Sequence, residues 1–260
     1  MSSYDFIVDN MRFSHSSTSS FENCAHGFKL AYITPMPRED NFFSDYGLLV
    51  HDCMERFFNK ELEGYELSGH YLKMFDSAVK CPAPDQAMRG RYKEQGLYFF
   101  DNFSFPLEEY EVVVVEDTID FNLYGIEITA RPDLVLRKKR DGKTVLVDYK
   151  TSLPFRKNMK TGEKTTPDKK KLEGYYKQMY LYAYALREHK GMDIDEICLW
   201  FPRANRMITI PWSLEKEEEA IKQFKSIVVR IREEEVFPAD NSSSYFCENL
   251  CGVRKYCEYR

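Results

Sequence analysis

The alternation of apolar and polar residues is clearest between residues 133 and 150, where it predicts a β-hairpin. The dipeptide Asp141-Gly142 is typical of two-residue hairpin turns, and the segments on both sides of it are rich in Val and Leu. With these two residues as the loop, Lys150 at one end of the hairpin lies opposite Asp133 at the other. The pattern therefore predicts two antiparallel strands with charged side chains at their free ends.

The two faces of this hairpin differ because successive side chains of a strand point to opposite sides. One face is suited to a buried core and carries Leu134, Leu136, Val145, Val147 and Tyr149. The other face carries two carboxylates and an amine among apolar residues, namely Asp133, Val135, Leu146, Asp148 and Lys150. We therefore expect Asp133, Asp148 and Lys150 to lie close to one another.

These three side chains are suited to the metal-dependent hydrolysis of a phosphodiester. Carboxylates and a neighbouring backbone carbonyl are hard oxygen ligands, which Mg²⁺ and Mn²⁺ prefer. Such an ion binds a substrate phosphate and activates water, while a nearby ammonium stabilises charge in the transition state. The alternative is a solvent-facing strand pair with an ion pair between Asp133 and Lys150.

Helical periodicity from Asp45 to Asn59 places His51 and Glu55 one turn apart on a largely apolar stripe. A charge on such a stripe needs a partner, because burying it alone is costly. The pair therefore either belongs to a metal site or forms an internal His–Glu hydrogen bond.

A second amphipathic helix, from about Lys171 to His189, places Gln178 and Tyr182 one turn apart on its core-facing stripe. Buried amides and phenols need hydrogen-bond partners. These two side chains could orient Lys150, a water or a phosphate, or they could form a satisfied pair within the core.

The remaining pattern predicts a helical N-terminal half followed by a sheet. Further helices are expected at 17–33, 45–62, 67–78, 84–101 and 214–234, and strands at 109–117, 120–128, 133–139, 144–150, 195–201 and 206–211. A chain of 260 residues can bury one sizeable core, and no linker or repeat divides it. We therefore expect an α/β (α+β) fold in a single domain over residues 1–260.

The order of these motifs resembles that of the PD-(D/E)xK nucleases, and more narrowly that of their RecB-type exonuclease branch. The motifs are Phe13-Ser14-His15-Ser16-Ser17, Phe21-x-x-Cys24, His51-x-x-x-Glu55, Pro132-Asp133, Asp148-Tyr149-Lys150-Thr151-Ser152 and Gln178-x-x-x-Tyr182. The similarity extends from about Ser14 to the C-terminus. One departure is that the family often has Gly shortly before the first Asp, where Ala130, Arg131 and Pro132 stand here.

The resemblance implies a restriction-endonuclease-like fold, with a central mixed β-sheet flanked by helices. It implies that Mg²⁺ or Mn²⁺ is held by His51, Asp133, Asp148 and the Tyr149 carbonyl. It further implies that Lys150 assists catalysis and that Gln178 and Tyr182 contact the site or the DNA. We expect Glu55 to orient His51 without contacting the metal ion itself.

The cysteines indicate a second centre. The chain has seven, an odd number that argues against a disulfide framework. Four thiolates are sufficient for a [4Fe–4S] cluster, which can be assembled from distant parts of a sequence. The pattern of three C-terminal cysteines and one near the N-terminus resembles the iron–sulfur subgroup of RecB-like nucleases, which includes AddB and CRISPR-associated exonucleases. The implied ligands are Cys24, Cys247, Cys251 and Cys257.

The cluster would tie both ends of the chain together. The usual spacing begins Cys-x-x-Cys, whereas this chain has Cys-x-x-x-Cys between Cys247 and Cys251. A four-cysteine Zn²⁺ site is the alternative.

The net charge of −5 is not typical of a DNA-binding protein, but basic residues gather between Arg156 and Lys171. This segment joins the predicted catalytic strand to the Gln178 helix, so we expect it to overhang the site and contact DNA phosphates. The lysines concerned are Lys157, Lys160, Lys164, Lys169 and Lys170. The alternative is a solvated surface loop.

The sequence has no apparent signal peptide or apolar run long enough to cross a membrane, so we expect a cytoplasmic protein without a membrane partner. Together with the resemblance, these features predict a divalent-metal-dependent DNA exonuclease that prefers single-stranded ends and serves repair, recombination or CRISPR adaptation. A helicase or another DNA-processing protein is a candidate partner. The alternatives are a non-catalytic iron–sulfur DNA-binding adaptor and a hydrolase of another phosphodiester.

Overall fold

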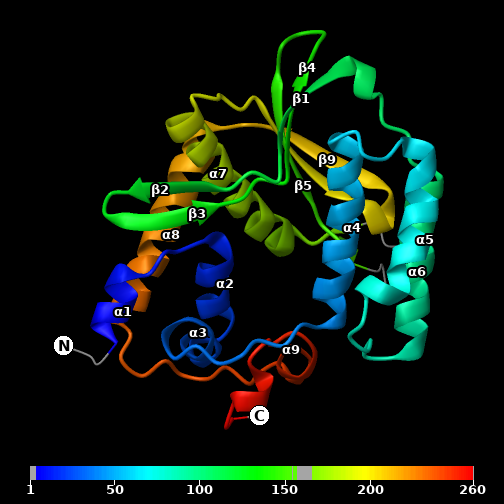
Figure 1. Ribbon diagram of the computed structural model, residues 1–260. Coiled ribbons are helices and arrows are strands. Elements are labelled where there is room, and N and C mark those ends of the chain that lie inside the picture. Colours follow the sequence, from blue (N-terminus) through cyan, green and yellow to red (C-terminus); the bar gives the residue numbers. More distant parts are fainter. Residues whose placement is uncertain (1–3, 154, 157–165, 260) are drawn as a thin grey trace.

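The computed structural model describes residues 4–153, 155–156 and 166–259. In Figure 1 the strands of a central sheet stand between two groups of helices, with α4, α5 and α6 on one side and α7 and α8 on the other. The longer helices are α2 (His15–Asn23), α4 (Phe42–Phe58), α5 (Leu67–Ala78), α6 (Gln86–Asp101), α7 (Lys169–Lys190) and α8 (Leu214–Glu233). The shorter ones are α1 (Asp5–Asn10), α3 (Ala25–Phe28), which continues into a π-helical turn (Lys29–Ile33), and α9 (Ser244–Asn249).

The central sheet has five strands in the order β1-β4-β5-β8-β9. They are β1 (Tyr110–Val115), β4 (Leu134–Lys138), β5 (Thr144–Tyr149), β8 (Glu196–Phe201) and β9 (Arg206–Pro211). Neighbouring strands are antiparallel except β5 and β8, which are parallel and joined through the crossover helix α7. Two short pairs, β2 (Ile119–Leu123) with β3 (Ile126–Ala130) and β6 (Phe155–Arg156) with β7 (Thr166–Pro167), lie outside this sheet. The predicted mixed sheet flanked by helices is confirmed.

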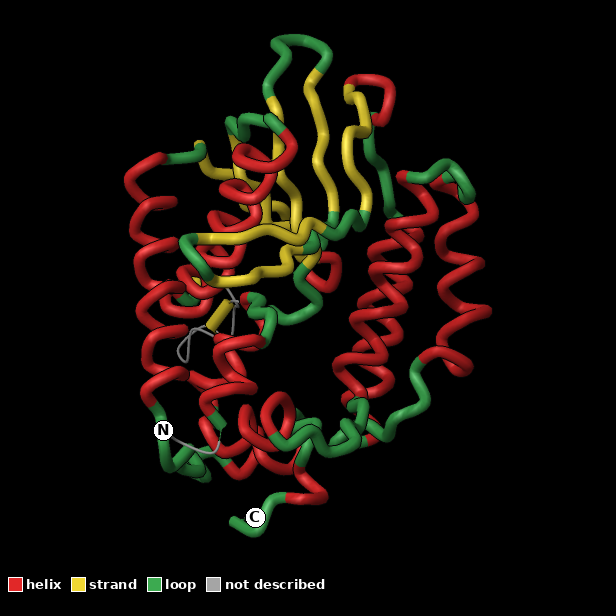
Figure 2. Tube along the Cα trace, turned by 60° about the vertical axis from the view of Figure 1, so that its left-hand side comes forward, coloured by secondary structure: helices red, strands yellow, loops and turns green. Residues whose placement is uncertain are grey.

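Both faces of the sheet are buried, as a strand pattern with few polar positions predicts. One face, which includes Leu134, Val147 and Trp200, packs against α4, α5 and α6. The opposite face, which includes Val135 and Leu146, packs beneath α7 and α8. Figure 2 shows the same layering, with helices on both sides of the strands.

The predicted pairing within the β4–β5 hairpin is wrong by two residues. Leu134 lies opposite Val147, and Lys138 donates a backbone hydrogen bond to Lys143 at 2.8 Å. The loop therefore holds four residues rather than two, with Gly142 in the left-handed region at φ 73°. Because the shift is an even number of residues, each side chain stays on its predicted face.

The single strand predicted at 120–128 is also wrong, because the chain turns back in the middle of it. Tyr124 and Gly125 have φ values of 51° and 85°, which suit the tight turns of hairpins. The Asn122 side chain accepts a hydrogen bond from the Gly125 amide at 2.8 Å. An apolar run of this length thus forms two strands, β2 and β3.

The helix predicted at 17–33 is interrupted at Cys24. The backbone of Cys24 is extended, and its sulfur accepts a hydrogen bond from the Gly27 amide at the start of α3. The interruption directs the thiol toward the C-terminal tail, because the Asp240 amide also donates to Cys24 Sγ, at 3.4 Å.

Two backbone connections hold the ends of the chain against the rest of the molecule. Phe13 pairs with β3, since its amide donates to the Glu127 carbonyl and its carbonyl accepts from the Thr129 amide, both at 2.8 Å. In the tail, the Gly252 carbonyl accepts from the Glu39 amide at 2.7 Å. The chain ends lie on the same side of the molecule, away from the loop that joins β4 to β5 (Figures 1 and 2).

Candidate active site

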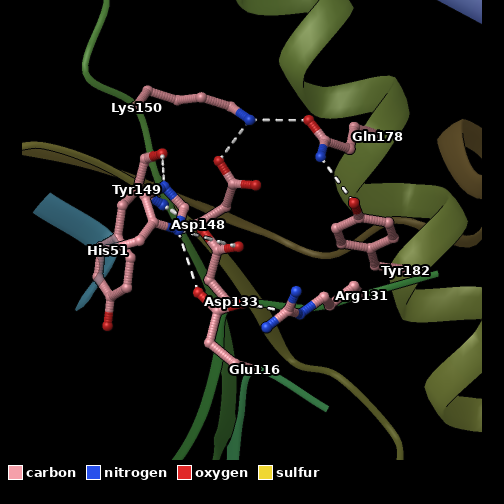
Figure 3. A network of polar contacts seen from close by, with 9 residues as sticks. All are labelled: His51, Glu116, Arg131, Asp133, Asp148, Tyr149, Lys150, Gln178 and Tyr182. Carbon is pink, nitrogen blue, oxygen red and sulfur yellow. Dashed lines mark hydrogen bonds and ion pairs between the residues drawn. The ribbon is translucent and has the colours of Figure 1, made fainter. Parts of the chain in front are cut away.

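A network of polar side chains gathers where β4 and β5 come together at one end (Figure 3). Strand β5 and the residue after it provide Asp148, Tyr149 and Lys150, whereas Asp133 immediately precedes β4. The others come from α4, the residue after β1, the segment before β4, and α7, and are His51, Glu116, Arg131, Gln178 and Tyr182. The sequence predicted all of these except Glu116 and Arg131.

Lys150 is held from two sides. Its Nζ lies 2.7 Å from Asp148 Oδ2 and donates a hydrogen bond to Gln178 Oε1, also at 2.7 Å. The Gln178 amide nitrogen in turn donates to the Tyr182 hydroxyl at 2.8 Å. Gln178 and Tyr182 therefore form a chain of hydrogen bonds that fixes the direction of the amine.

The amine of Lys150 is charged. Burial alone would lower its pKa, but the Asp148 and Asp133 carboxylates raise that pKa above its usual value. Lys150 can therefore donate hydrogen bonds to an anion.

The two aspartates are adjacent and buried, with exposed fractions of 7% for Asp133 and 2% for Asp148. Asp133 Oδ2 accepts a hydrogen bond from the Tyr149 amide at 2.8 Å. Burial raises the pKa of Asp133, and the nearby charge of Asp148 raises it further. Two carboxylates in this setting repel each other, so a bound cation would stabilise both.

His51 lies between the carboxylates and the backbone of β5. Its Nδ1 is 3.1 Å from Glu116 Oε1 and 3.8 Å from Asp133 Oδ1, and its Nε2 is 3.2 Å from the Tyr149 carbonyl. Burial alone would lower the pKa of His51, but Asp133 and Glu116 raise it to about 9. A metal ion therefore competes with a proton at this ring.

Glu116 takes the place that the sequence assigned to Glu55. Among the described residues Glu116 is the carboxylate that hydrogen-bonds to His51, with Asp133 farther away, and Glu55 makes no hydrogen bond with the ring. Arg131 holds the other oxygen of Glu116 at 3.1 Å. Glu116 also has a φ of 48°, a strained conformation for a residue with a side chain. The available signal was the acidic pair Glu116-Asp117 directly after the valines of β1.

His15 is a second residue that the sequence analysis left without a role. It stands at the start of α2 and hydrogen-bonds to the backbone of Gly174 in α7. Burial lowers its pKa to about 4, with further lowering by the charges of Lys150 and Lys177. The imidazole is therefore neutral and lies near the Lys150 amine.

The donor set fits a divalent metal ion. Ligand atoms of His51, Glu116 and Asp133 all lie within 4.8 Å of one another. Asp148 Oδ2 is buried and receives no hydrogen bond in good geometry, although Lys150 Nζ is close to it. Carboxylate oxygens together with one imidazole are suitable ligands for Mn²⁺. The carboxylate oxygens alone are suitable ligands for Mg²⁺.

The predicted DNA-binding lysines fall largely outside the described part of the chain. Lys157, Lys160 and Lys164 lie there, so their prediction stays untested. Lys169 is exposed at the first turn of α7, and Lys170 follows it in the helix. Both of these lysines therefore belong to the helix that carries Gln178.

The four cysteines of the predicted cluster line a single small cavity. All four are free thiols, and Cys247 Sγ donates to the Asp240 carbonyl at 3.9 Å. Burial raises the pKa of Cys251, and the nearby thiolates of Cys24, Cys257 and Cys247 raise it further. The fold therefore brings together cysteines from both ends of the chain.

The other three cysteines lie outside this cavity. Cys53 and Cys198 are buried in the core, and Cys81 is half-buried.

A mixed sheet flanked by helices, with two aspartates and a lysine at the ends of adjacent strands, defines a protein of the restriction-endonuclease-like class. The chain belongs to the PD-(D/E)XK nuclease superfamily, whose family model matches residues 12–259. Members of this superfamily are nucleases that use divalent metal ions and act on DNA.

Similar folds occur among solved structures. A presumed exonuclease from Eubacterium rectale is 14% identical, with a TM-score of 0.48 over 98% of this chain and 90% of the other. The protein SSO0001 is 18% identical, with a TM-score of 0.34 over 94% of each chain. At these scores neither likeness bears on the activity. No curated protein matches the sequence.

Within the described ranges, none of the helices has the length and apolar character needed to span a bilayer.

Proposed function

We propose that this protein is a divalent-metal-dependent DNA exonuclease that prefers single-stranded ends. The observation that carries the proposal is the convergence of Asp133, Asp148 and Lys150 at one end of the sheet. The order of motifs along the chain, which is similar to that of RecB-type exonucleases, supports the exonuclease assignment.

The residues that would hold the ion are His51, Asp133, Asp148 and the Tyr149 carbonyl, with Glu116 as a further candidate ligand. When bound, the ion supplies Lewis acidity toward the scissile phosphate and the attacking water. Before it binds, the charges of His51 and Lys150 partly compensate the aspartates.

In this proposal Lys150 acts on the phosphate directly. Its ammonium donates hydrogen bonds, and in a buried site such donors strongly stabilise the negative charge that develops during phosphodiester hydrolysis. Gln178 and Tyr182 hold the amine in one direction, so that little reorganisation is needed when the substrate arrives.

The burial of two proposed site residues supports a preference for single strands. The side chains of Lys150 and Asp148 are only 15% and 2% exposed. A flexible single strand can enter such a site more easily than a rigid duplex. The basic segment before α7 is suited to the phosphates of the incoming strand, with an affinity that falls as salt rises.

The test is digestion of DNA labelled at one end or the other. We expect Mn²⁺ or Mg²⁺ to support stepwise shortening of single-stranded DNA, slower digestion of duplex, and none with EDTA. Internal cuts would contradict the exonuclease assignment, and cleavage of RNA alone would indicate another phosphodiester. Tight DNA binding without any cleavage would indicate an adaptor.

We further propose that Cys24, Cys247, Cys251 and Cys257 hold a [4Fe–4S] cluster. Their shared cavity and their similarity to the iron–sulfur subgroup support the proposal. Protein purified without oxygen should be brown and contain iron and sulfide in equal amounts. A colourless protein with stoichiometric zinc would contradict the cluster.

A further inference from the structure

Arg203 lies beside the loop that follows β5 and hydrogen-bonds to the backbone of that loop. The residue belongs to a short 3₁₀ turn, Pro202–Ala204, that follows β8. Its Nη1 donates a hydrogen bond to the Thr151 carbonyl at 3.1 Å, and Thr151 directly follows Lys150. Its Nε donates to Gln95 Oε1 in α6 at 2.9 Å.

The guanidinium is also packed on an aromatic ring. It lies over Tyr92 of α6, with its central carbon 3.4 Å from the ring centroid. Burial lowers the pKa of Arg203 below its usual value. Because the planar group stacks on Tyr92 while two of its edges donate hydrogen bonds, its orientation is fixed.

No carboxylate among the described residues lies within ion-pairing distance of Arg203. It donates hydrogen bonds to a neutral amide and a backbone carbonyl. Burying a cation without an opposite charge is costly. These contacts therefore do not stabilise Arg203 as an ion pair would. What they accomplish is geometric, because they connect α6 to the residue after Lys150.

The loop after β5 is fixed at several successive points. The Lys150 amide donates to the Trp200 carbonyl at 2.8 Å. Arg203 then holds the Thr151 carbonyl, and the Ser152 hydroxyl contacts the hydroxyl of Tyr175. Removing Arg203 would leave Thr151 without this donor, between two points that remain fixed.

We infer that Arg203 is a positioning residue that supports Lys150 by holding the carbonyl of the next residue, Thr151, in place. The inference rests on the proposed nuclease function. A misplacement of about 1 Å in a catalytic group can cost about 100-fold in rate, even when the mutation is remote from the chemistry.

The test compares Arg203→Ala with Arg187→Ala on end-labelled single-stranded DNA with Mn²⁺. Arg187 is the matched control, because it packs near Tyr184 and Trp212 but pairs with Glu217, away from the site. We expect Arg203→Ala to lower kcat by about 10- to 100-fold with KM within about twofold. Arg187→Ala should lose stability while keeping its kcat.

Two further measurements separate positioning from simple structural damage. Low concentrations of guanidinium ion should restore part of the kcat of Arg203→Ala and none in the control. The kcat of Arg203→Lys should fall between those of the wild type and Arg203→Ala, because an ammonium cannot reproduce both the stacking and the forked hydrogen bonds. If Arg203→Ala does not fold, Arg203→Lys and Gln95→Leu carry the same comparison.

Amide hydrogen exchange in residues 150–153, measured without DNA or metal, tests this inference independently of the proposed nuclease function. Faster exchange in Arg203→Ala than in Arg187→Ala supports positioning, even if the wild type cleaves no DNA. Unchanged exchange with unchanged kcat overturns it. A rise in KM with unchanged kcat, together with a weaker salt dependence of DNA binding, also overturns it, because Arg203 would then contact DNA directly.

Discussion

Buried charges that stabilise one another dominate the site at the scale of single residues. Asp133 and Asp148 repel each other, and His51 and Lys150 partly compensate them. Glu116 adds a third acid, held by His51 and Arg131. The three acids are paired with three cations, His51, Lys150 and Arg131, so a divalent ion would take over the role of the proton on His51 in compensating the aspartates.

The role of Glu116 can be tested by comparing Glu116→Gln with Glu55→Gln. Glu116 contacts His51 at 3.1 Å, whereas Glu55 makes no hydrogen bond with it. Loss of a group that holds or orients a ligand typically costs about 10- to 100-fold in metal affinity. We expect this loss in Glu116→Gln, measured by calorimetric titration with Mn²⁺, and none in Glu55→Gln. Equal losses in the two variants would contradict the assignment.

The raised pKa of His51 predicts how metal binding depends on pH. In the metal-free protein, protonated His51 stabilises the fold fully below pH 6.5, and this contribution is lost as pH rises through about 9. Because the ion and the proton compete, metal affinity should rise over the same window.

The rise in melting temperature caused by Mn²⁺ should therefore grow from pH 6.5 to 8.5. A tenfold gain in affinity corresponds to about 1.4 kcal/mol. A metal-induced rise that does not change with pH would show that His51 is not displaced from its proton.

At the scale of elements, even-numbered errors of strand pairing are harmless to the site. The predicted β4–β5 pairing is wrong by two residues, yet Asp148 and Lys150 stay on the face that meets α7 because side chains alternate with a period of two. The sequence pattern specifies the face of each residue, whereas the length of the loop decides the pairing.

The contacts of Glu116 and Arg203 could not be predicted in the same way. They join segments that are far apart in the chain, β1 with α4 and the turn after β8 with α6. No periodicity within one element encodes which distant backbone it will meet. The motif residues were predictable because the family resemblance indicated that they gather in one site.

Helix α6 provides a test of packing at this scale. A Cβ at Gly96 would lie 2.6 Å from Tyr71 Cζ and 2.8 Å from the Tyr46 hydroxyl, whereas nothing lies within 4 Å of one at Gly90. Gly96→Ala should therefore destabilise the protein by about 1–3 kcal/mol. Gly90→Ala, in the same helix, should stabilise it by about 0.5–1 kcal/mol. Urea unfolding checks both, and a stable Gly96→Ala would refute the close approach of α5 to α6.

At the scale of the whole molecule, both ends of the chain are held close to the nuclease core. Phe13 pairs with β3 and so places the start of α2 near the site. The tail contacts Glu39 and brings its cysteines to Cys24. A bound cluster would therefore stabilise the arrangement of helices around the site as well as the tail.

Replacement of one cluster cysteine tests this connection, with Cys81→Ser as the matched control outside the cavity. Cys251→Ser should lose the visible absorption of the cluster and unfold at lower temperature. A loss of about 2 kcal/mol lowers the melting temperature of a chain of this size by about 4–8 °C. Equal melting temperatures for the two variants would contradict a structural role for the cluster.

The most direct measurement is the rate at which Lys150→Ala shortens end-labelled single-stranded DNA at saturating Mn²⁺, alongside its affinity for the same strand. Lys150 pairs with Asp148 and donates to Gln178, and it supplies the only amine of the predicted catalytic set. We expect cleavage to fall by at least about 100-fold, because one preorganised donor to the developing charge is lost, while DNA binding and melting temperature stay close to wild type. Cleavage by Lys150→Ala at the wild-type rate would contradict the proposed site.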